Sequence, residues 1–307
     1  MKVLLTGASG FLGQYVLRAL QQCGITAVAV GRRLPRHLAG ATFVAADLLA
    51  AEDLPALARQ VGASHLLLLA WVTEHGRYWV SPENFRWVDA STRLVQAFCA
   101  AGGQHVLVAG SCAEYDWSHG CCREDTTPLD PATVYGVAKD ATRRLVAALC
   151  AQHGVRCAWG RVFFPYGAGE APARLVPSLV AALQGQCEEF GVRAAQARDL
   201  LHAGDVAQAF VTLLRSQAGG CYNLSSGQAV PVGEVVQTLA RLLDADPQPV
   251  LGRAPTRPAG PAMLVGHNAK LRSLGWRQRS TLAQGLAQTL HDLSDRTTDQ
   301  REQFHGA

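Results

Sequence analysis

The sequence predicts an α/β fold, a doubly wound parallel sheet followed by a smaller C-terminal α/β lobe. Two patterns predict it: short apolar runs alternate with longer segments of helical periodicity, and a glycine-rich turn directly follows the first apolar run. Such alternation is typical of βαβ units, in which crossover helices join parallel strands. Apolar residues make up 49% and charged residues 17% of the 307-residue chain. This composition supports a large core and excludes a wholly disordered chain.

The elements of the first half follow from local patterns. Extended apolar runs predict strands over residues 3–5, 27–30, 42–45, 65–69, 105–109 and 156–162. Apolar residues at helical spacing predict helices over residues 15–23, 84–101 and 132–153. Gly102 and Gly103 end the second helix and Gly154 ends the third, because glycine readily adopts the backbone conformation that closes a helix.

The regular alternation weakens after Gly167, where prolines and glycines become frequent. Helical patterns over residues 175–184, 232–243 and 282–293 alternate there with short extended pieces. We therefore expect one domain over residues 1–165, with late strands from about 195–225, and a second lobe mainly over residues 166–295. Residues 296–307 form a tail whose polar composition favours disorder.

The composition also excludes several classes of protein. The net charge is only +4 and no run of basic residues exceeds two, so nucleic-acid binding is not expected. Glycines and Arg18 interrupt the N-terminal apolar stretch, and no later run reaches about 18 apolar residues, so we expect neither a signal peptide nor a membrane span. Nine cysteines without C-x-x-C spacing predict free thiols, no metal site and a cytoplasmic location.

Three glycines follow the first predicted strand at G-x-x-G-x-x-G spacing and open the first predicted helix. Glycines at such a turn let a ligand approach the backbone closely, so a pyrophosphate can bind at the helix N-terminus. We therefore expect a dinucleotide-binding loop. Its expected contacts with the cofactor are Gly7, Ser9, Gly10, Phe11, Leu12 and Gly13.

The end of the second predicted strand indicates which dinucleotide binds. A carboxylate there would bind the ribose hydroxyls of NAD, whereas this chain has Arg32 and Arg33. Guanidinium groups suit the additional phosphate of NADP, so we expect NADP, with NAD still possible. The ends of the next two strands are expected to contribute Asp47, Leu48, Leu69, Ala70 and Trp71 to the cofactor site, and Tyr135 and Lys139 are expected to contact the cofactor as well.

Tyr135 and Lys139 lie four residues apart on a predicted helix and therefore on the same face. Tyrosine ordinarily has a pKa of about 10, and a nearby ammonium stabilises the phenolate, so the phenol can exchange a proton with a carbonyl oxygen. Lys139 is one of only three lysines in the chain. Ser111 follows the fifth predicted strand, where ligands bind in open α/β sheets, and completes the expected catalytic set.

Together these motifs resemble the extended short-chain dehydrogenases of the NAD-dependent epimerase/dehydratase family, whose members mostly act on nucleotide sugars. The resemblance covers nearly the whole chain and continues in residues 161–167, 198–202, 205–206, 223–227 and 274–276. It implies a Rossmann domain for NADP, a substrate-binding C-terminal lobe, and a homodimer formed through two long helices of each subunit. It implies neither a nucleic-acid nor a membrane partner.

The chain departs from this family at several positions. The dehydratases carry an Asp-Glu pair after the catalytic serine or threonine, and Cys112 and Ala113 replace it here, which argues against a dehydratase. Trp87 and Phe164 replace two asparagines that are usual in the family, and core packing is the expected role of Trp87. The residues expected to bind substrate are Cys112, Tyr115, Phe164, Arg198, His202 and Arg253.

The leading functional hypothesis is therefore an NADP-dependent ketoreductase acting on a nucleotide-linked 4-keto-6-deoxysugar. The same residues can oxidise and re-reduce C4, which makes a nucleotide-sugar 4-epimerase the first alternative. A reductase of a non-sugar carbonyl is a second alternative, given the aromatic replacements. A non-catalytic NADP-sensing protein is a third, because a Rossmann fold alone does not establish activity.

Overall fold

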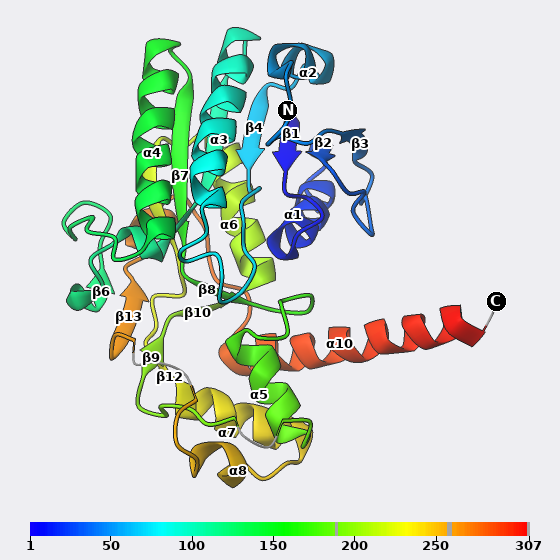
Figure 1. The fold of residues 1–307 in the computed structure, drawn as a ribbon, viewed down its shortest axis with the longest axis vertical. Helices are drawn as coiled ribbons and strands as arrows, with labels where there is room; N and C mark the ends of the chain where they lie inside the picture. Colours follow the sequence, from blue (N-terminus) through cyan, green and yellow to red (C-terminus); the bar gives the residue numbers. More distant parts are fainter. Residues whose placement is uncertain (188–189, 257–259, 306–307) are drawn as a thin grey trace.

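The computed structural model describes residues 1–187, 190–256 and 260–305 and is built around one sheet of seven strands (Figure 1). The strand order is β11-β7-β5-β4-β1-β2-β3, and every neighbouring pair is parallel. The strands are β1 (Lys2–Thr6), β2 (Thr26–Gly31), β3 (Thr42–Ala45), β4 (His65–Leu68), β5 (His105–Ser111), β7 (Arg156–Val162) and β11 (Gly220–Leu224). The chain winds outward in both directions from β1 and β4, which confirms the predicted doubly wound sheet.

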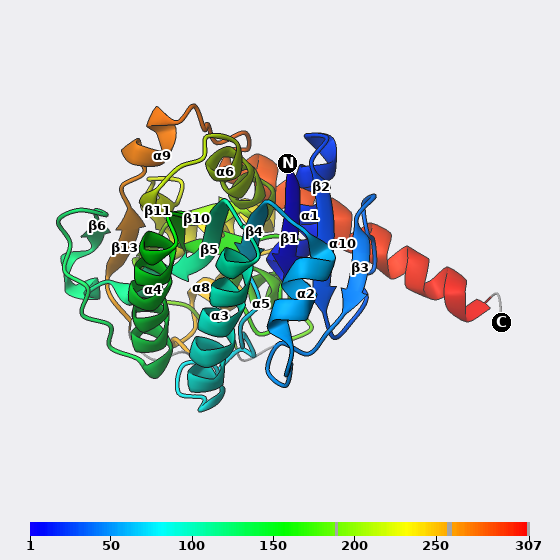
Figure 2. The ribbon, with the colours of Figure 1, turned by 90° about the horizontal axis from the view of Figure 1, so that it is seen from above.

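Helices cover both faces of this sheet (Figure 2). On one face lie α1 (Phe11–Gln22) and α6 (Ala203–Arg215), and on the other lie α2 (Leu54–Val61), α3 (Glu83–Ala100) and α4 (Val134–Gln152). Successive side chains of a strand point to opposite faces, so both faces of each strand must be apolar. Val3 and Leu5 of β1 accordingly join the α1–α6 core, while Leu4 joins the core beneath α2, α3 and α4.

The smaller lobe, at the bottom of Figure 1, has its own apolar core. Val176, Leu179, Val235, Leu239 and Leu286 are among its fully buried members. The helices of this lobe are α5 (Leu175–Leu183), α7 (Val232–Leu243), α8 (Gln248–Leu251) and the first turns of α10 (Leu282–His305).

Short strand pairings join the two parts of the molecule and were not predicted individually. A parallel pair links β8 (Phe164–Tyr166) to β10 (Leu200–His202). A second sheet has the order β12-β9-β13-β6 and is formed by β12 (Val230–Pro231), β9 (Ala197–Arg198), β13 (Met263–Gly266) and β6 (Cys121–Cys122). Of the late strands expected from about 195–225, only β11 joins the main sheet, because β9 and β10 pair elsewhere.

Helices α1 and α10 differ by several residues from their predicted extents, and helices α2 and α6 were not predicted. Helix α1 begins at Phe11 rather than Tyr15, because the glycine loop leads directly into the helix. Helix α2 was not predicted; Asp53 caps it by accepting a hydrogen bond from the Ala56 N–H. Helix α10 continues to His305, so the expectation of a disordered tail is wrong through that residue, while residues 306–307 lie outside the described residues. An established helix extends easily through residues that include no glycine or proline.

The remaining elements are short. They are the 3-10 turns η1 (Cys112–Glu114) and η2 (Trp117–His119) and the helix α9 (Ala269–Ser273). Within the three described stretches of chain, no helix combines the length and the apolar character needed to cross a bilayer.

Candidate active site

The glycine loop between β1 and α1 forms a cradle that side chains would fill. Gly7 has a φ of +73°, and a Cβ there would lie 2.7 Å from the Ala70 amide nitrogen. A Cβ on Gly13 would lie 2.6 Å from the Ala8 Cα. Both positions therefore require glycine. Gly10 is the N-cap of α1 and has no side chain to accept hydrogen bonds from the N–H groups of the first turn, so a pyrophosphate could take that place.

The other predicted cofactor residues surround this loop. The Ala70 N–H donates to Thr6 Oγ1 at 3.2 Å, which places Leu69, Ala70 and Trp71 beside the glycine loop. At the end of β2, Arg32 Nη1 lies 3.9 Å from Asp47 Oδ2, and both side chains are exposed. An exposed pair of this kind contributes little to stability, so Arg32 is free to bind an anion.

Ser111 and Tyr135 meet at the carboxyl end of β5. Ser111 is the last residue of β5, and Tyr135 lies in the first turn of α4, where the Thr133 hydroxyl caps the helix by accepting from the Gly136 N–H. Burial raises the pKa of Tyr135 above its ordinary value, and a side-chain hydrogen bond with Ser111 offsets part of that effect. The phenol is therefore protonated at neutral pH and can act as an acid.

Lys139 lies one turn further along α4 and is 3% exposed. Its ammonium donates to the Ala109 carbonyl at 3.0 Å and lies 3.8 Å from the centroid of a Trp71 ring. The distance from Lys139 Nζ to the Tyr135 ring centroid is 5.9 Å. Burial lowers the pKa of Lys139 to about 7, against the opposing charge of Glu114. The structure therefore brings the predicted catalytic set of Ser111, Tyr135 and Lys139 together.

Two aromatic residues that were not predicted as site residues pack directly on Tyr135. The rings of Tyr78 and Trp79 meet the Tyr135 ring edge to face, with centroids 4.9 and 5.7 Å away. The Tyr135 N–H also donates to the Trp79 carbonyl at 3.1 Å. Both residues belong to the connection between β4 and α3. Its aromatic content, following the carboxyl end of a strand, was the available signal in the sequence.

A cleft of about 270 Å³ opens between the sheet and the smaller lobe. Predicted residues Phe164 and Arg198 line it, with the Arg198 guanidinium 5.6 Å from the centroid of the Phe164 ring. Arg174, which was not predicted, lies 5.2 Å from the centroid of the Tyr78 ring. The cleft thus combines aromatic walls with three arginines, Arg174, Arg193 and Arg198. Its lining also includes His75, Trp79, Phe163, Tyr166 and Phe190.

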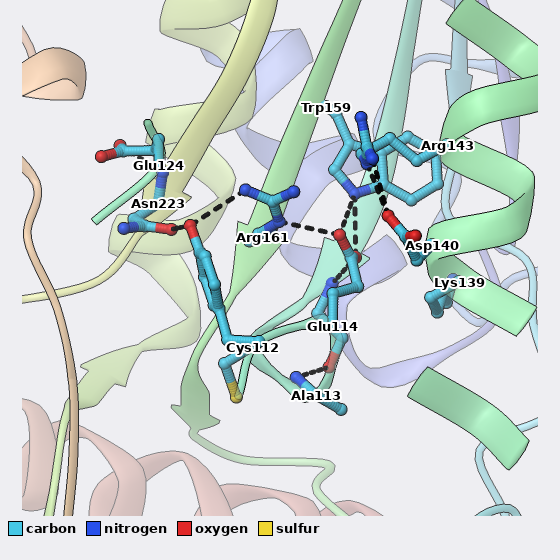
Figure 3. A network of polar contacts seen from close by, with 12 residues as sticks. Cys112, Ala113, Glu114, Glu124, Lys139, Asp140, Arg143, Trp159, Arg161 and Asn223 are labelled. Carbon is cyan, nitrogen blue, oxygen red and sulfur yellow. Dashed lines mark hydrogen bonds and ion pairs between the residues drawn. The ribbon is translucent and has the colours of Figure 1, made fainter. Parts of the chain in front are cut away.

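Tyr115, a predicted substrate contact, lies instead in a buried polar network beneath the site. It is 1% exposed, its hydroxyl donates to Asn223 Oδ1 at 2.8 Å and accepts from Arg161 Nη1 at 2.9 Å. Figure 3 shows Arg161 between Asn223 and Glu114. Glu114 accepts from Arg161 Nε at 2.7 Å and from Trp159 Nε1 at 2.9 Å. Glu114 therefore points into the core, and the network ties β5 to β7 and β11.

The other three predicted substrate contacts lie outside the cleft lining. His202 caps α6 by accepting from the Gly204 N–H, and its ring packs between two tyrosines. Cys112 is 6% exposed and packs in an apolar cluster, where burial raises the pKa of its thiol. Arg253 is exposed and its Cβ adjoins Gly191, a residue of the cleft wall. Local sequence does not reveal these positions, because they depend on how β8, β10 and the smaller lobe pack.

Comparisons with known proteins agree with this geometry. Residues 3–225 match the model of the NAD dependent epimerase/dehydratase family. MoeE5, solved in complex with UDP-glucuronic acid and NAD, superposes with a TM-score of 0.83 at 29% identity, covering 97% of this chain and 100% of MoeE5. The UDP-glucose 4-epimerase of Azospirillum brasilense is 27% identical over 94% of this chain and 90% of its own length.

A third relative is a larger protein. The trifunctional UDP-glucose 4,6-dehydratase/UDP-4-keto-6-deoxy-D-glucose 3,5-epimerase/UDP-4-keto-L-rhamnose-reductase of Arabidopsis thaliana is 24% identical over 94% of this chain. The chain spans 46% of the length of that relative. The family match covers most of the chain and includes the glycine loop, Ser111, Tyr135 and Lys139. The chain therefore belongs to the NAD-dependent epimerase/dehydratase family.

Proposed function

We propose that this protein is an NADP-dependent ketoreductase acting on a nucleotide-linked 4-keto-6-deoxysugar. The observation that carries the proposal is the half-buried, protonated phenol of Tyr135 beside Ser111, with Lys139 one turn away and an aromatic, cationic cleft alongside. A reductase needs its tyrosine to begin the reaction as an acid, and this phenol is in that state.

The proton chemistry follows from these positions. When bound, a reduced nicotinamide supplies a hydride to the carbonyl carbon. Tyr135 donates its phenolic proton to the carbonyl oxygen, which gives the alcohol and leaves a phenolate. The Ser111 hydroxyl and the Lys139 ammonium stabilise that phenolate, and Tyr135 regains its proton from solvent.

The chain offers a fitting site for the cofactor. Glycines at positions 7 and 13 let the loop pack closely on the backbone at Ala70 and Ala8 as it enters α1, and the N–H groups at the start of that helix would bind a pyrophosphate. Arg32 and Arg33 at the end of β2 suit the additional phosphate of NADP. The similar MoeE5 structure contains NAD, so the preference for NADP rests on these two arginines.

A nucleotide-sugar 4-epimerase is the second candidate. The similar MoeE5 structure contains NAD and a UDP-sugar, and the Azospirillum brasilense relative is a UDP-glucose 4-epimerase. An epimerase also begins from the alcohol, so its tyrosine must first accept a proton. A dehydratase is disfavoured, because Glu114 is fully buried against Arg161 and has no access to the cleft.

We also infer that the protein forms a homodimer through α3 and α4. Phe85 of α3 and Val137 and Leu145 of α4 are large apolar residues that are 63%, 50% and 48% exposed. Removing this surface from water would favour association of two copies.

The test is a titration of purified protein with NADPH and NADH, followed by absorbance at the nicotinamide band with a panel of nucleotide-4-keto-6-deoxysugars. Stoichiometric oxidation of NADPH by one of them establishes the ketoreductase. Interconversion of UDP-sugar epimers without net consumption of the dinucleotide establishes the epimerase instead. Tight binding of NADPH without either reaction would overturn both.

A further inference from the structure

The contacts of the Lys139 ammonium are not explained by the four-residue spacing between Tyr135 and Lys139 alone. The ammonium is buried, yet among the described residues the acceptor of its hydrogen bond is the single carbonyl of Ala109. Glu114 of η1 acts on it only through space, because the Glu114 carboxylate is bound to Arg161 of β7 and to Trp159. The closest aromatic face is that of Trp71, 3.8 Å away. A cation over an indole face is attracted by the ring quadrupole, most strongly where water is excluded.

Trp71 is itself held in place from behind. Its Nε1–H donates to Asn84 Oδ1 at 2.9 Å, and Asn84 is fully buried. The Asn84 amide nitrogen donates to the carbonyls of Tyr78 at 2.7 Å and Ser81 at 2.9 Å. Because both polar atoms of this buried amide are engaged, rotation of Asn84 would leave several polar groups unsatisfied.

The same connection reaches the second catalytic residue. Asn84 fixes the backbone at Tyr78, and Tyr78 and Trp79 pack their rings on Tyr135. The segment 71–84 therefore contacts both residues of the pair. Tyr78 and Trp79 pack on Tyr135, and Trp71 packs on the ammonium of Lys139. One buried amide links these two contacts.

We propose that Trp71 is a positioning residue of Lys139: its indole face, anchored by Asn84, seats the ammonium beside the Ala109 carbonyl and one helical turn from Tyr135. The role of Lys139 in the reaction rests on the proposed function. The contact between the Trp71 ring and the Lys139 ammonium, which we call the seat of Lys139, does not. The charged and titratable groups that act on Lys139 and on the neighbouring Tyr135 are Glu114 and Cys112 of η1 and Tyr78 of the β4–α3 connection, with Ser111 of β5 as a hydrogen-bonding neighbour of Tyr135.

The seat can be observed directly, because the chain has only Lys2, Lys139 and Lys270. Protein labelled with ¹³C-lysine gives three Cε–H signals, which Lys2→Arg and Lys270→Arg variants assign. We expect the Lys139 signal to be shifted upfield by the Trp71 ring. In Trp71→Leu that upfield displacement is lost, and the titration midpoint of the signal falls by about one pH unit, because the ring no longer stabilises the ammonium.

Two further variants distinguish the effect of the Trp71 ring on Lys139 from a general loss of packing. Trp71→Phe keeps an aromatic face but loses the hydrogen bond to Asn84, so it should retain part of the upfield displacement. Trp87→Leu is the matched control: it removes an indole that stacks on Trp71 with centroids 6.2 Å apart, and it should leave the Lys139 titration unchanged. If Trp71→Leu does not fold, Trp71→Phe and Trp87→Leu still carry the comparison.

Activity gives the second readout. If Lys139 must be protonated, kcat/KM falls above its pKa, and this alkaline limb should move down by about one pH unit in Trp71→Leu. An unchanged Lys139 signal and titration in the Trp71 variants would overturn the proposal while leaving the ketoreductase assignment intact. If the Lys139 signal behaves as expected but the protein turns over no keto sugar, the proposed function is refuted and the contact between Trp71 and Lys139 is upheld.

Discussion

Tyr135 and Lys139 lie one turn apart on α4, and desolvation shifts their pKa values in opposite directions. Desolvation disfavours whichever form is charged, so it keeps the Tyr135 phenol protonated and lowers the pKa of Lys139 to about 7. The pair therefore consists of an acid and an ammonium that readily loses its proton near neutrality. This arrangement makes the charge state of Lys139 the feature most sensitive to ligands and pH.

Replacing Tyr135 by phenylalanine should abolish turnover while leaving NADPH binding nearly unchanged. The variant removes only the hydroxyl that donates the proton, and general acid catalysis contributes roughly a factor of 10²–10⁴. The measurement is kcat with the identified substrate, together with the Kd for NADPH. A fully active variant would show that another group supplies the proton.

Arg32→Ala tests the preference for NADP. The exposed guanidinium of Arg32 is free to pair with the additional phosphate of NADPH. Its loss should therefore weaken the affinity for NADPH at least tenfold and change the affinity for NADH by no more than about twofold. Titration of both dinucleotides by fluorescence measures the two Kd values. Equal losses for the two would contradict the phosphate contact.

At the scale of elements, the site depends on how closely β1, α1 and the end of β4 approach one another. Gly7 touches the backbone at Ala70, and Gly13 lies against the first residues of the loop. Neither position has room for a methyl group. The loop is therefore shaped by contacts between elements as well as by the freedom of glycine.

Gly13→Ala should accordingly destabilise the fold and abolish dinucleotide binding. The new Cβ would meet the backbone of Ala8, and overpacking of this kind costs typically 1–3 kcal/mol. Gly219→Ala is the matched control, because its Cβ would make only ordinary contact, 3.7 Å from the Cys157 carbonyl. Thermal unfolding and NADPH binding are measured for both. Comparable losses in the two variants would count against the steric argument.

At the scale of the whole molecule, the outer faces of α3 and α4 form the surface through which we propose that two copies associate. Leu145→Glu places a charge on that surface without entering the core, since Leu145 is 48% exposed. We expect the variant to sediment as a monomer at concentrations where the natural protein is a dimer. Leu242→Glu, at a 42% exposed position of α7 away from this surface, should not change the oligomeric state.

The end of the sheet remote from the site predicts how stability depends on pH. His105 is 1% exposed, Nε2 hydrogen-bonds the Ala218 carbonyl, and its ring packs on His65. Burial lowers the pKa of His105 to about 4 from 6.5. The unfolded chain therefore binds more protons than the folded chain between these values, so stability is complete above pH 6.5 and is lost as pH falls toward 4.

For His105 alone, the free energy of unfolding should fall by about 2 kcal/mol between pH 7.5 and pH 5. Urea unfolding at a series of pH values measures this slope. In His105→Leu, which has no titrating group at this position, the slope should be smaller. An identical slope in both proteins would mean that other groups govern the acid sensitivity.

The local sequence was sufficient to predict the main elements and to recognise the motifs of this chain. Strands β3 and β7 and helix α7 have the predicted bounds, because short apolar runs mark the strands of a parallel sheet and amphipathic helices repeat apolar residues at helical spacing. Tyr135 and Lys139 were predictable as a pair for a similar reason: a spacing of four residues fixes their common face once the segment is helical.

The tertiary structure alone decided what surrounds these residues. Tyr115 was predicted to face the substrate but turns inward, because the buried Arg161 of β7 and Asn223 of β11 offer it hydrogen-bond partners that are far away in sequence. Trp71 and Asn84 were likewise not recognisable as the seat of Lys139. By itself the sequence determined the parallel sheet, the glycine loop and the catalytic pair, since these depend on neighbours within a few positions. Burial and long-range packing, which no local pattern encodes, decided the charge states and the walls of the cleft.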